Sequence, residues 1–235
     1  MTTETMRPQR IFRSIIALIV LALAAAYSAY QGPQPTQRAS RDAQVTKTPS
    51  SFDYYLISLS WSPSYCEINP NDNEQCGRRG YGFILHGLWP QYERGGGPQE
   101  CASNQSVDRD TISRTLAFMP SRRLIEHEWR SHGTCSGLAA DAYFELADRA
   151  FAAVRIPRAL ATAGKPPAMT AEQVRAAFVD ANPGMQTDML AVSCHAGALS
   201  EVRICVDETL HPRACGRGVR MQCPKDNALR IPLIR

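Results

Sequence analysis

The alternation of hydrophobic and polar positions predicts a mixture of strands and helices after about residue 50. Residues 52–63, FDYYLISLSWSP, are β-branched and aromatic with partial alternation, and residues 81–90, YGFILHGLWP, are similar. We expect a buried strand in each segment, ended by its proline. Residues 189–210 predict two further strands around a glycine turn. The polar residues 66–80 are expected to form a loop closed by two cysteines.

Four segments have helical periodicity. Residues 108–118 and 122–130 have helical spacing, and residues 141–155 place their apolar side chains on one helix face. Residues 170–184 begin with Thr and Gln three positions apart, which predicts a capping box, and end in Asn-Pro-Gly, which predicts a stop. Strands and helices do not alternate regularly, and this favours an α+β fold over a βαβ arrangement.

The first fifty residues have a different pattern. Three arginines precede an uncharged apolar run over residues 14–30, and small residues near its end offer cleavage sites of the A-x-A kind. Residues 1–30 therefore predict a cleaved secretory signal, with an uncleaved membrane anchor as the alternative, because the run is short for a bilayer span. Residues 31–50 are rich in Pro, Gln, Thr and Ser and predict a disordered linker. The functional domain is then 51–235.

Charge and cysteine content narrow the function classes. The net charge is +4, and 23 basic and 21 acidic residues follow residue 30. This balance is too mild for a protein that binds nucleic acid through clustered basic charge, so a nucleic-acid substrate would need a local site. All eight cysteines follow the apolar run. In an oxidising compartment they predict four disulfides, and the absence of a C-x-x-C pair argues against a zinc thiolate site.

Two short segments collect titratable side chains. LHGLWPQ at 85–91 carries His86, and HEWRSHGTC at 127–135 carries Glu128 and His132. On a helix Glu128 and His132 are four residues apart and share a face. A carboxylate beside an imidazole orients the ring and favours its protonated form. Two such rings on different elements suit a reaction that needs a base on one side and an acid on the other.

Each motif also has other interpretations. His86 or His132, taken alone, could be a core histidine satisfied by a backbone carbonyl. A zincin carries zinc-binding histidines four residues apart, whereas His127 and His132 are five apart, roughly 140° around a helix. Cys135 could be a nucleophile, but an exported thiol among eight cysteines is expected to be oxidised. These spacings favour acid–base chemistry over a metal or thiol site.

LHGLWPQ and HEWRSHGTC resemble the two signature segments of the T2 ribonuclease family, which comprises secreted, disulfide-bonded endoribonucleases that need no metal or other cofactor. LISLSWSPSYC at 56–66 and EVRICVDE at 201–208 are similar to the first core strand and the last conserved strand of the family. The resemblance covers residues 52 to about 225. It implies an α+β fold with a central antiparallel sheet packed by helices.

The resemblance also implies catalytic roles. His86 matches the general acid that protonates the leaving 5′-oxygen, and His132 matches the general base that deprotonates the ribose 2′-hydroxyl. Glu128 matches a carboxylate beside the scissile phosphate. The implied substrate is single-stranded RNA, cleaved through a 2′,3′-cyclic phosphate, whereas DNA lacks the hydroxyl and should be inert.

Phosphate and base contacts follow from the same resemblance. His127 matches a histidine that helps to hold the phosphate. The family usually has lysine at the position of Ser131, and Arg130 is the nearest substitute for that charge. Trp89 matches an aromatic residue that stacks on a base, and Gln91 could bond to the edge of that base. Trp89 could instead be a core tryptophan.

The disulfides implied by the resemblance are Cys66–Cys76, Cys101–Cys135, Cys194–Cys223 and Cys205–Cys215. We therefore expect a secreted or periplasmic endoribonuclease, a monomer that contacts a membrane only through an uncleaved N-terminal segment. The alternative, motivated by Ser131, is a catalytically weakened RNA- or partner-binding protein on the same scaffold. A toxin-like role is a third possibility on which the sequence is silent.

Overall fold

The computed structural model describes residues 52–77, 79–103, 105–161, 164, 167–224 and 227–234. The predicted signal or anchor (1–30) and linker (31–50) lie outside this part of the chain. Within it, no helix is both long enough and apolar enough to cross a bilayer.

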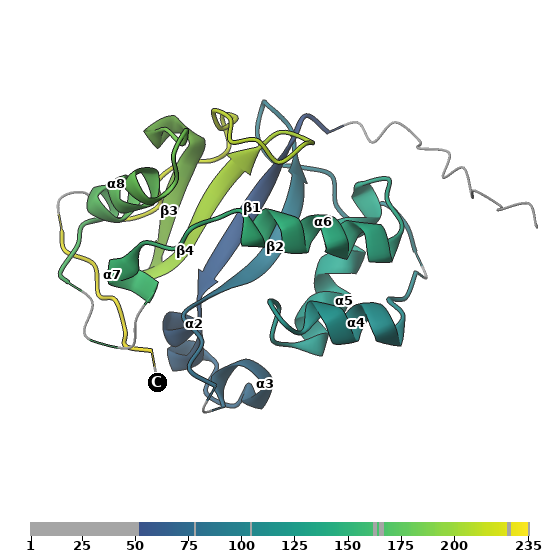
Figure 1. Cartoon of the computed structure of the whole chain (residues 1–235), viewed down its shortest axis with the longest axis horizontal. Helices are drawn as coiled ribbons and strands as arrows, with labels where there is room; N and C mark the ends of the chain where they lie inside the picture. The colour runs from purple at the N-terminus through teal and green to yellow at the C-terminus, as the bar shows by residue number, and fades with distance from the viewer. Residues whose placement is uncertain are drawn as a thin grey trace, which may run out of the picture. The chain divides into compact units, whose positions relative to one another are not determined.

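A four-stranded antiparallel sheet forms the centre of the fold, in the order β2-β1-β4-β3 (Figure 1). Its strands are β1 (Tyr54–Trp61), β2 (Phe83–Gln91), β3 (Leu190–His195) and β4 (Ala198–Val206). The turn from β3 to β4 contains Gly197 with a φ of +74°, a conformation that favours glycine. The four predicted strands and the α+β class are confirmed.

The helices of the described residues are α2 (Ser62–Ile68), α3 (Asn73–Cys76), α4 (Arg109–Thr115), α5 (Arg122–Ser131), α6 (Ala140–Ala152), α7 (Arg158–Ala161) and α8 (Ala171–Ala181), with 3₁₀ turns η1 (Gly133–Cys135) and η2 (Thr187–Met189). The larger helices α5, α6 and α8 pack against one face of this sheet. Figure 1 shows α4, α5 and α6 beside β2, and α7 and α8 toward β3. The capping box of Thr170 and Gln173 is confirmed at the start of α8.

Two expectations about prolines and loops were wrong. The segment 66–80 is not a loop throughout, because α2 begins with Pro63 in its first turn and α3 begins at Asp72, whose carboxylate accepts from two backbone N–H groups. Proline is tolerated in a first helical turn because no intrahelical acceptor is available there. Strand β2 also continues past Pro90 to Gln91. As the edge strand, β2 can lose one N–H to proline without breaking a ladder on its outer side.

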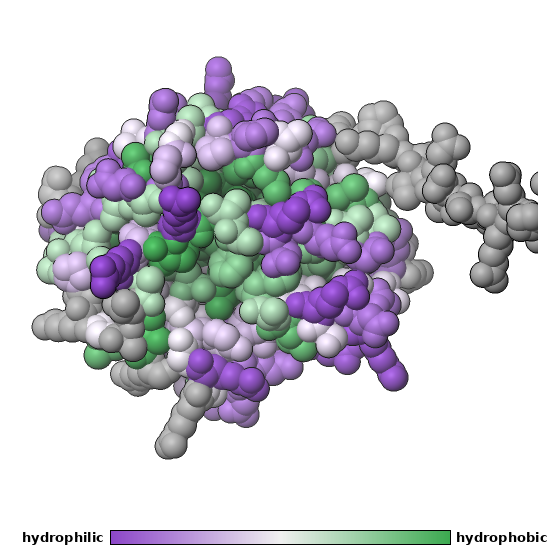
Figure 2. Space-filling model, viewed as in Figure 1, coloured by the Kyte–Doolittle hydropathy of each residue, from purple (hydrophilic) through white to green (hydrophobic). Residues whose placement is uncertain are grey.

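The two faces of the sheet differ in chemistry. Residues Tyr55, Ile57, Leu59 and Trp61 alternate along β1 and are buried in the main hydrophobic core, which the helices α5, α6 and α8 complete. Figure 2 shows hydrophobic residues in the middle of the face turned to the viewer, with polar side chains around them. On the opposite face of β1, Ser58 and Ser60 replace large apolar side chains. Around these two serines the face has room for polar groups from the neighbouring strands, whereas Tyr54 and Leu56 on the same face join a smaller apolar cluster.

The four disulfides implied by the resemblance are all present, and the described residues contain no free cysteine. Cys101–Cys135 joins the loop after β2 to η1, directly after His132. A hydrogen bond from the Glu100 N–H to the Ser131 carbonyl, 3.0 Å long, reinforces this connection.

Removing Cys101–Cys135 should destabilise the protein more than removing Cys66–Cys76. The first closes a sequence separation of 34 residues and the second a separation of 10. Loop-closure entropy then gives about 4 kcal/mol against about 3 kcal/mol. Urea unfolding of the two double alanine variants measures the difference. A larger loss of unfolding free energy for the 66/76 variant would contradict this ranking.

Candidate active site

A β-bulge between β1 and β2 presents His86. The register pairs Ser58 with Gly87 and then Leu59 with Leu85, so His86 is the extra residue of the bulge. A bulge re-aims the side chain that it carries, and bulges are common beside active sites. The His86 side chain is 33% exposed. It therefore faces both the protein and solvent, as a proton-transfer group must.

A buried carboxylate lies beside this histidine. Glu128, on α5, is 1% exposed, and its Oε1 is 3.6 Å from Nε2 of His86. Its Oε2 accepts a 2.7 Å hydrogen bond from the indole N–H of Trp89. A Cβ atom at Gly87 would lie 2.0 Å from this carboxylate oxygen, so glycine is required for the close approach. The two predicted motifs therefore meet where Glu128 of the second contacts His86 and Trp89 of the first.

The second histidine reaches the same place from the end of α5. His132 is the C-cap residue, with φ −127° and ψ −45°, and its backbone N–H donates to the Glu128 carbonyl at 2.9 Å. Its ring centroid is 5.2 Å from that of Trp89, and the ring of His86 is 5.1 Å from the same indole. The expectation that His132 and Glu128 project to one side holds, although His132 lies just past the helix. The indole of Trp89 connects all three side chains.

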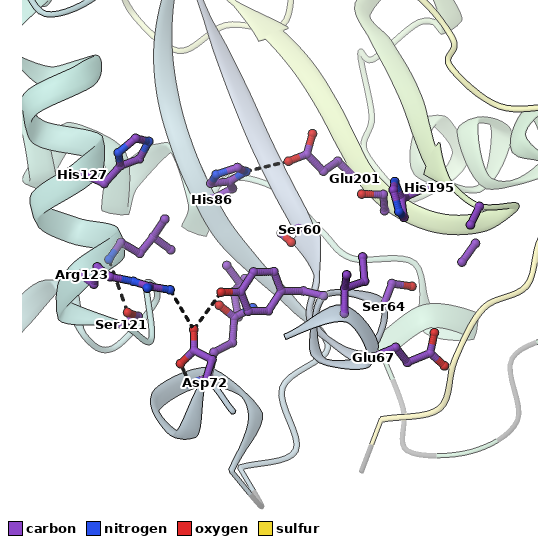
Figure 3. Close-up of a pocket in the computed structure, with 18 of the residues that line it drawn as sticks. Ser60, Ser64, Glu67, Asp72, His86, Ser121, Arg123, His127, His195 and Glu201 are labelled. Atoms are coloured by element: carbon purple, nitrogen blue, oxygen red, sulfur yellow. Dashed lines mark hydrogen bonds and ion pairs between the residues drawn. The ribbon is translucent and has the colours of Figure 1, made fainter. Parts of the chain in front are cut away.

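Two further charged residues of the site were missed by the sequence reasoning. Nδ1 of His86 donates a 2.6 Å hydrogen bond to Oε1 of Glu201 on β4 (Figure 3). The other oxygen of Glu201 accepts two hydrogen bonds from Arg203, at 2.9 and 2.7 Å. The alternation in EVRIC was the available signal, because it places residues 201 and 203 on one face of a strand.

A cavity of about 810 Å³ opens beside these groups. His86, His127, Arg130 and Glu201 line it at one end, and Figure 3 shows the labelled His127 on α5 facing the side of the cavity that holds His86. Ser131 is buried, and its hydroxyl oxygen is 3.5 Å from Nδ1 of His127. The predicted phosphate-binding pair, His127 and Arg130, thus borders open space next to His86.

The two base-binding candidates have other contacts in the structure. Trp89 packs between the two histidine rings and is half-buried, and Gln91 donates to the adjacent Pro90 carbonyl at 2.9 Å. Neither residue lines the large cavity. The placement of Trp89 explains the histidine geometry, and its stacking on a base stays a prediction.

The surroundings shift the pKa values of the two catalytic candidates in opposite directions. Burial alone would lower the pKa of His86, but the hydrogen bond that His86 donates to Glu201 and the charges of Glu128 and Glu201 raise it above its ordinary 6.5. Burial lowers the pKa of His132 to about 4, assisted by the charges of His127 and His86. Among the described residues, Nδ1 of His132 is buried without a hydrogen-bond partner. His86 is therefore protonated at pH values at which His132 is neutral.

The pKa values of the two carboxylates, Glu128 and Glu201, are also shifted in opposite directions. Burial raises the pKa of Glu128 to about 7, against the opposing effects of His86 and the Trp89 hydrogen bond. Burial would also raise the pKa of Glu201, but His86 and Arg203 lower it to about 2. Glu201 is thus a permanent negative charge, and Glu128 exchanges a proton near neutrality. Within the described part of the chain, no cluster of three His, Cys, Asp or Glu residues could hold a metal ion.

Comparison with known proteins identifies the relatives of this chain. Over 108 residues the chain is 45% identical to a ribonuclease of Aeromonas hydrophila, an alignment that covers 46% of this chain and 49% of that protein. The chain thus spans about half the length of that curated relative. The structure of an RNase-related protein from Calystegia sepium superimposes with a TM-score of 0.63 at 27% identity, covering 78% of this chain and 98% of the other.

A second solved structure is RNase NT in complex with 5′-AMP, with a TM-score of 0.52 at 26% identity over 73% of this chain and 98% of that one. The model of the ribonuclease T2 family matches residues 52–215, which include every strand of the sheet and both histidine motifs. The chain therefore belongs to the ribonuclease T2 family.

Proposed function

We propose that the protein is an endoribonuclease that cleaves single-stranded RNA by attack of the ribose 2′-hydroxyl on the neighbouring phosphorus. The observation that carries this proposal is the pair of imidazoles, His86 and His132, held against one indole with pKa values shifted in opposite directions. Environments that separate two pKa values in one site assign the acid and the base. Membership of the T2 family supports the substrate class.

In the first step His132 accepts the 2′-hydroxyl proton as the oxygen attacks phosphorus. A ring with a pKa of about 4 is neutral at most pH values and so is available as a base. His86 donates its proton to the departing 5′-oxygen, which breaks the P–O bond and leaves a 2′,3′-cyclic phosphate. A water molecule then opens the cyclic phosphate with the two histidines in exchanged roles. No metal is needed, because the 2′-hydroxyl of the substrate is the nucleophile. DNA lacks this hydroxyl and should not be cleaved.

Arg130 and His127, at one edge of the cavity, stabilise the negative charge on the phosphoryl oxygens. We call this pair the cationic edge. Arg130 is exposed and His127 lies one turn from Ser131 on α5, and both border the cavity beside His86. Burial and the Arg130 charge lower the pKa of His127, so this imidazole is mainly a neutral donor above pH 6.5. Ser131 adds a hydroxyl where the family usually has lysine. The phosphate is therefore stabilised with one charge fewer, and removing one such contact costs roughly 100-fold in rate.

We further propose that the enzyme acts outside the cytoplasm, secreted or in the periplasm. Four disulfides stabilise the domain, and disulfides persist in oxidising compartments. The layout of signal or anchor at 1–30, linker at 31–50 and ribonuclease domain at 51–235 is part of this proposal, as is a monomer that contacts a membrane only through the N-terminal segment.

A catalytically weakened binding protein remains the alternative function, motivated by Ser131. It would retain the cavity and the cationic edge but leave RNA intact. The nature of the product separates the two functions.

Purified protein should cleave a mixed-sequence RNA in the presence of EDTA and yield 2′,3′-cyclic phosphate ends. His86→Ala and His132→Ala should each lower the rate about 100- to 10,000-fold, because each removes one proton-transfer group. Mass spectrometry of the products identifies the ends, and a DNA of the same sequence is the control. Intact RNA with wild-type protein, or equal cleavage by wild type and His86→Ala, would refute the enzymatic function.

The rate should have a bell-shaped dependence on pH. Activity requires neutral His132, so kcat/KM should rise as pH rises through about 4. It also requires protonated His86, so kcat/KM should fall as pH rises through a value above 6.5. Initial rates on a dinucleotide substrate between pH 3 and 9 measure both limbs. An acidic limb near 6.5 would show that His132 is not the low-pKa base.

Ser131→Lys should raise kcat, because it restores a positive charge one turn from His127. The expected gain is about 10- to 100-fold, the inverse of losing one transition-state contact. Ser131→Ala is the matched control, since it removes the hydroxyl without adding charge and should change kcat only slightly. An unchanged kcat for the lysine variant, with unchanged thermal stability, would mean that Arg130 already supplies the required charge, and a fall in kcat would contradict the prediction outright.

A further inference from the structure

Glu201 makes the shortest hydrogen bond to either catalytic histidine. Its Oε1 accepts from Nδ1 of His86 at 2.6 Å, across 115 residues of sequence. The Glu201 side chain is 10% exposed, so little water competes for this carboxylate. The bond occupies Nδ1 and leaves Nε2 of His86 directed toward Glu128, on the side where a substrate oxygen would receive a proton.

Arg203 holds this carboxylate in place. Two of its nitrogens donate to Oε2, the oxygen that His86 does not use, at 2.9 and 2.7 Å. The guanidinium carbon lies 5.7 Å from the centre of the Trp89 ring, within the range of a cation–π contact. Because Trp89 also contacts both catalytic rings, Arg203 joins the Glu201 carboxylate to the rest of the site. The Glu201 carboxylate is therefore held by His86 on one oxygen and by Arg203 on the other, which leaves it few alternative positions.

The sheet leaves a path for the contact between His86 and Glu201. Strands β2 and β4 flank β1 and are roughly 10 Å apart, so a side chain from one must pass over β1 to meet the other. The cross-strand partners are Ser60 opposite Glu201, and Ser58 opposite Arg203 and Gly87. Both β1 residues are small, and Figure 3 shows His86 and Glu201 facing each other over the part of β1 that bears Ser60. The bulge at His86 turns its ring onto this path.

We propose that Glu201, held by Arg203, is a positioning residue that fixes the ring orientation and tautomer of His86 and keeps it protonated for acid catalysis. The proposal deepens the ribonuclease function and rests on it. Glu201 touches no reacting atom, and it acts through the imidazole in the way that a buried carboxylate orients the histidine of a catalytic triad.

Several charges face His86, and their signs determine what a substitution should do. From β4 these are Glu201, which favours the protonated ring, and Arg203, which opposes it. From α5 and its C-cap they are Glu128, which also favours it, and His127 and His132, which oppose it when charged. Removing the Glu201 charge leaves one favourable carboxylate, so the pKa of His86 should fall.

Glu201→Gln tests the proposal, because the amide retains the shape of the side chain and loses its charge. The His86 pKa, followed by NMR titration of its ring in the free protein, should fall by about one unit or more. In RNA cleavage, kcat should fall about 10- to 100-fold with little change in KM, and the alkaline limb of the pH profile should move to lower pH. Glu201→Asp keeps the charge on a shorter side chain. It should lose kcat while the His86 pKa stays closer to that of wild type.

Glu93→Gln is the matched control. It also removes a carboxylate that pairs with an arginine, Arg213, but it lies in the loop after β2 and should leave both the His86 pKa and kcat unchanged. Should the His86 pKa be equal in Glu201→Gln and wild type, the proposal is wrong. The NMR measurement needs no RNA, so an inactive wild type would overturn the ribonuclease function and leave this test valid. If Glu201→Gln does not fold, the aspartate variant decides, because unchanged kcat there would refute a positioning role.

Discussion

The contact on which the site depends is the carboxylate of Glu128, buried between the indole of Trp89 and the ring of His86. Burying a carboxylate is costly unless it is paired or protonated, and this one accepts a single hydrogen bond and lies 3.6 Å from an imidazole nitrogen. The raised pKa of about 7 is the consequence of that cost. The approach is possible only because residue 87 is glycine, since any Cβ there would collide with the carboxylate and the indole. The LHGLW motif is thus explained position by position: a core leucine, a bulged histidine, a glycine that leaves room for the carboxylate, a second core leucine and the indole that donates to the carboxylate.

That contact separates the environments of the two imidazoles. His86 is flanked by Glu128 and Glu201, and both negative charges favour its protonated form. His132 contacts the opposite side of the site, where its Nδ1 is buried without a partner among the described residues and where burial dominates. The same indole contacts both rings. A protonated and a neutral imidazole therefore lie against the same indole, which is the pairing that the proposed cleavage of a phosphodiester requires.

The sequence predicts strands, helices and caps well because the signal for each lies within a few neighbouring residues. Periodicity predicts the strands, and the Thr170 and Gln173 pair fixes the start of α8. The helix α2 escaped prediction because Pro63 was interpreted only as a strand stop, and proline in a first helical turn has the same local signature. The helix α3 is only four residues long and lies in a polar segment that was interpreted as a loop. The contact between His86 and Glu201 could not be derived, since it requires the strand order, the register over Ser60 and the bulge together. The residues alone indicated acid–base chemistry at the histidines, and the resemblance supplied their individual roles and the disulfide pairing, since eight cysteines by themselves allow 105 pairings.

His132, the proposed base, lies just past the end of α5 and is held through its backbone. His132 has left the helix, so no continuing helix fixes its position. Its N–H donates to the Glu128 carbonyl, its own carbonyl accepts from the Cys135 N–H at 3.0 Å, and Cys135 is joined to Cys101. The adjacent Ser131 carbonyl accepts from Glu100 in the same loop. His86, by contrast, sits in a sheet and is fixed through its side chain by Glu201. In the proposed mechanism the acid, His86, is positioned through its side chain and the base, His132, through its backbone, and among the described residues Nδ1 of His132 has no hydrogen-bond partner.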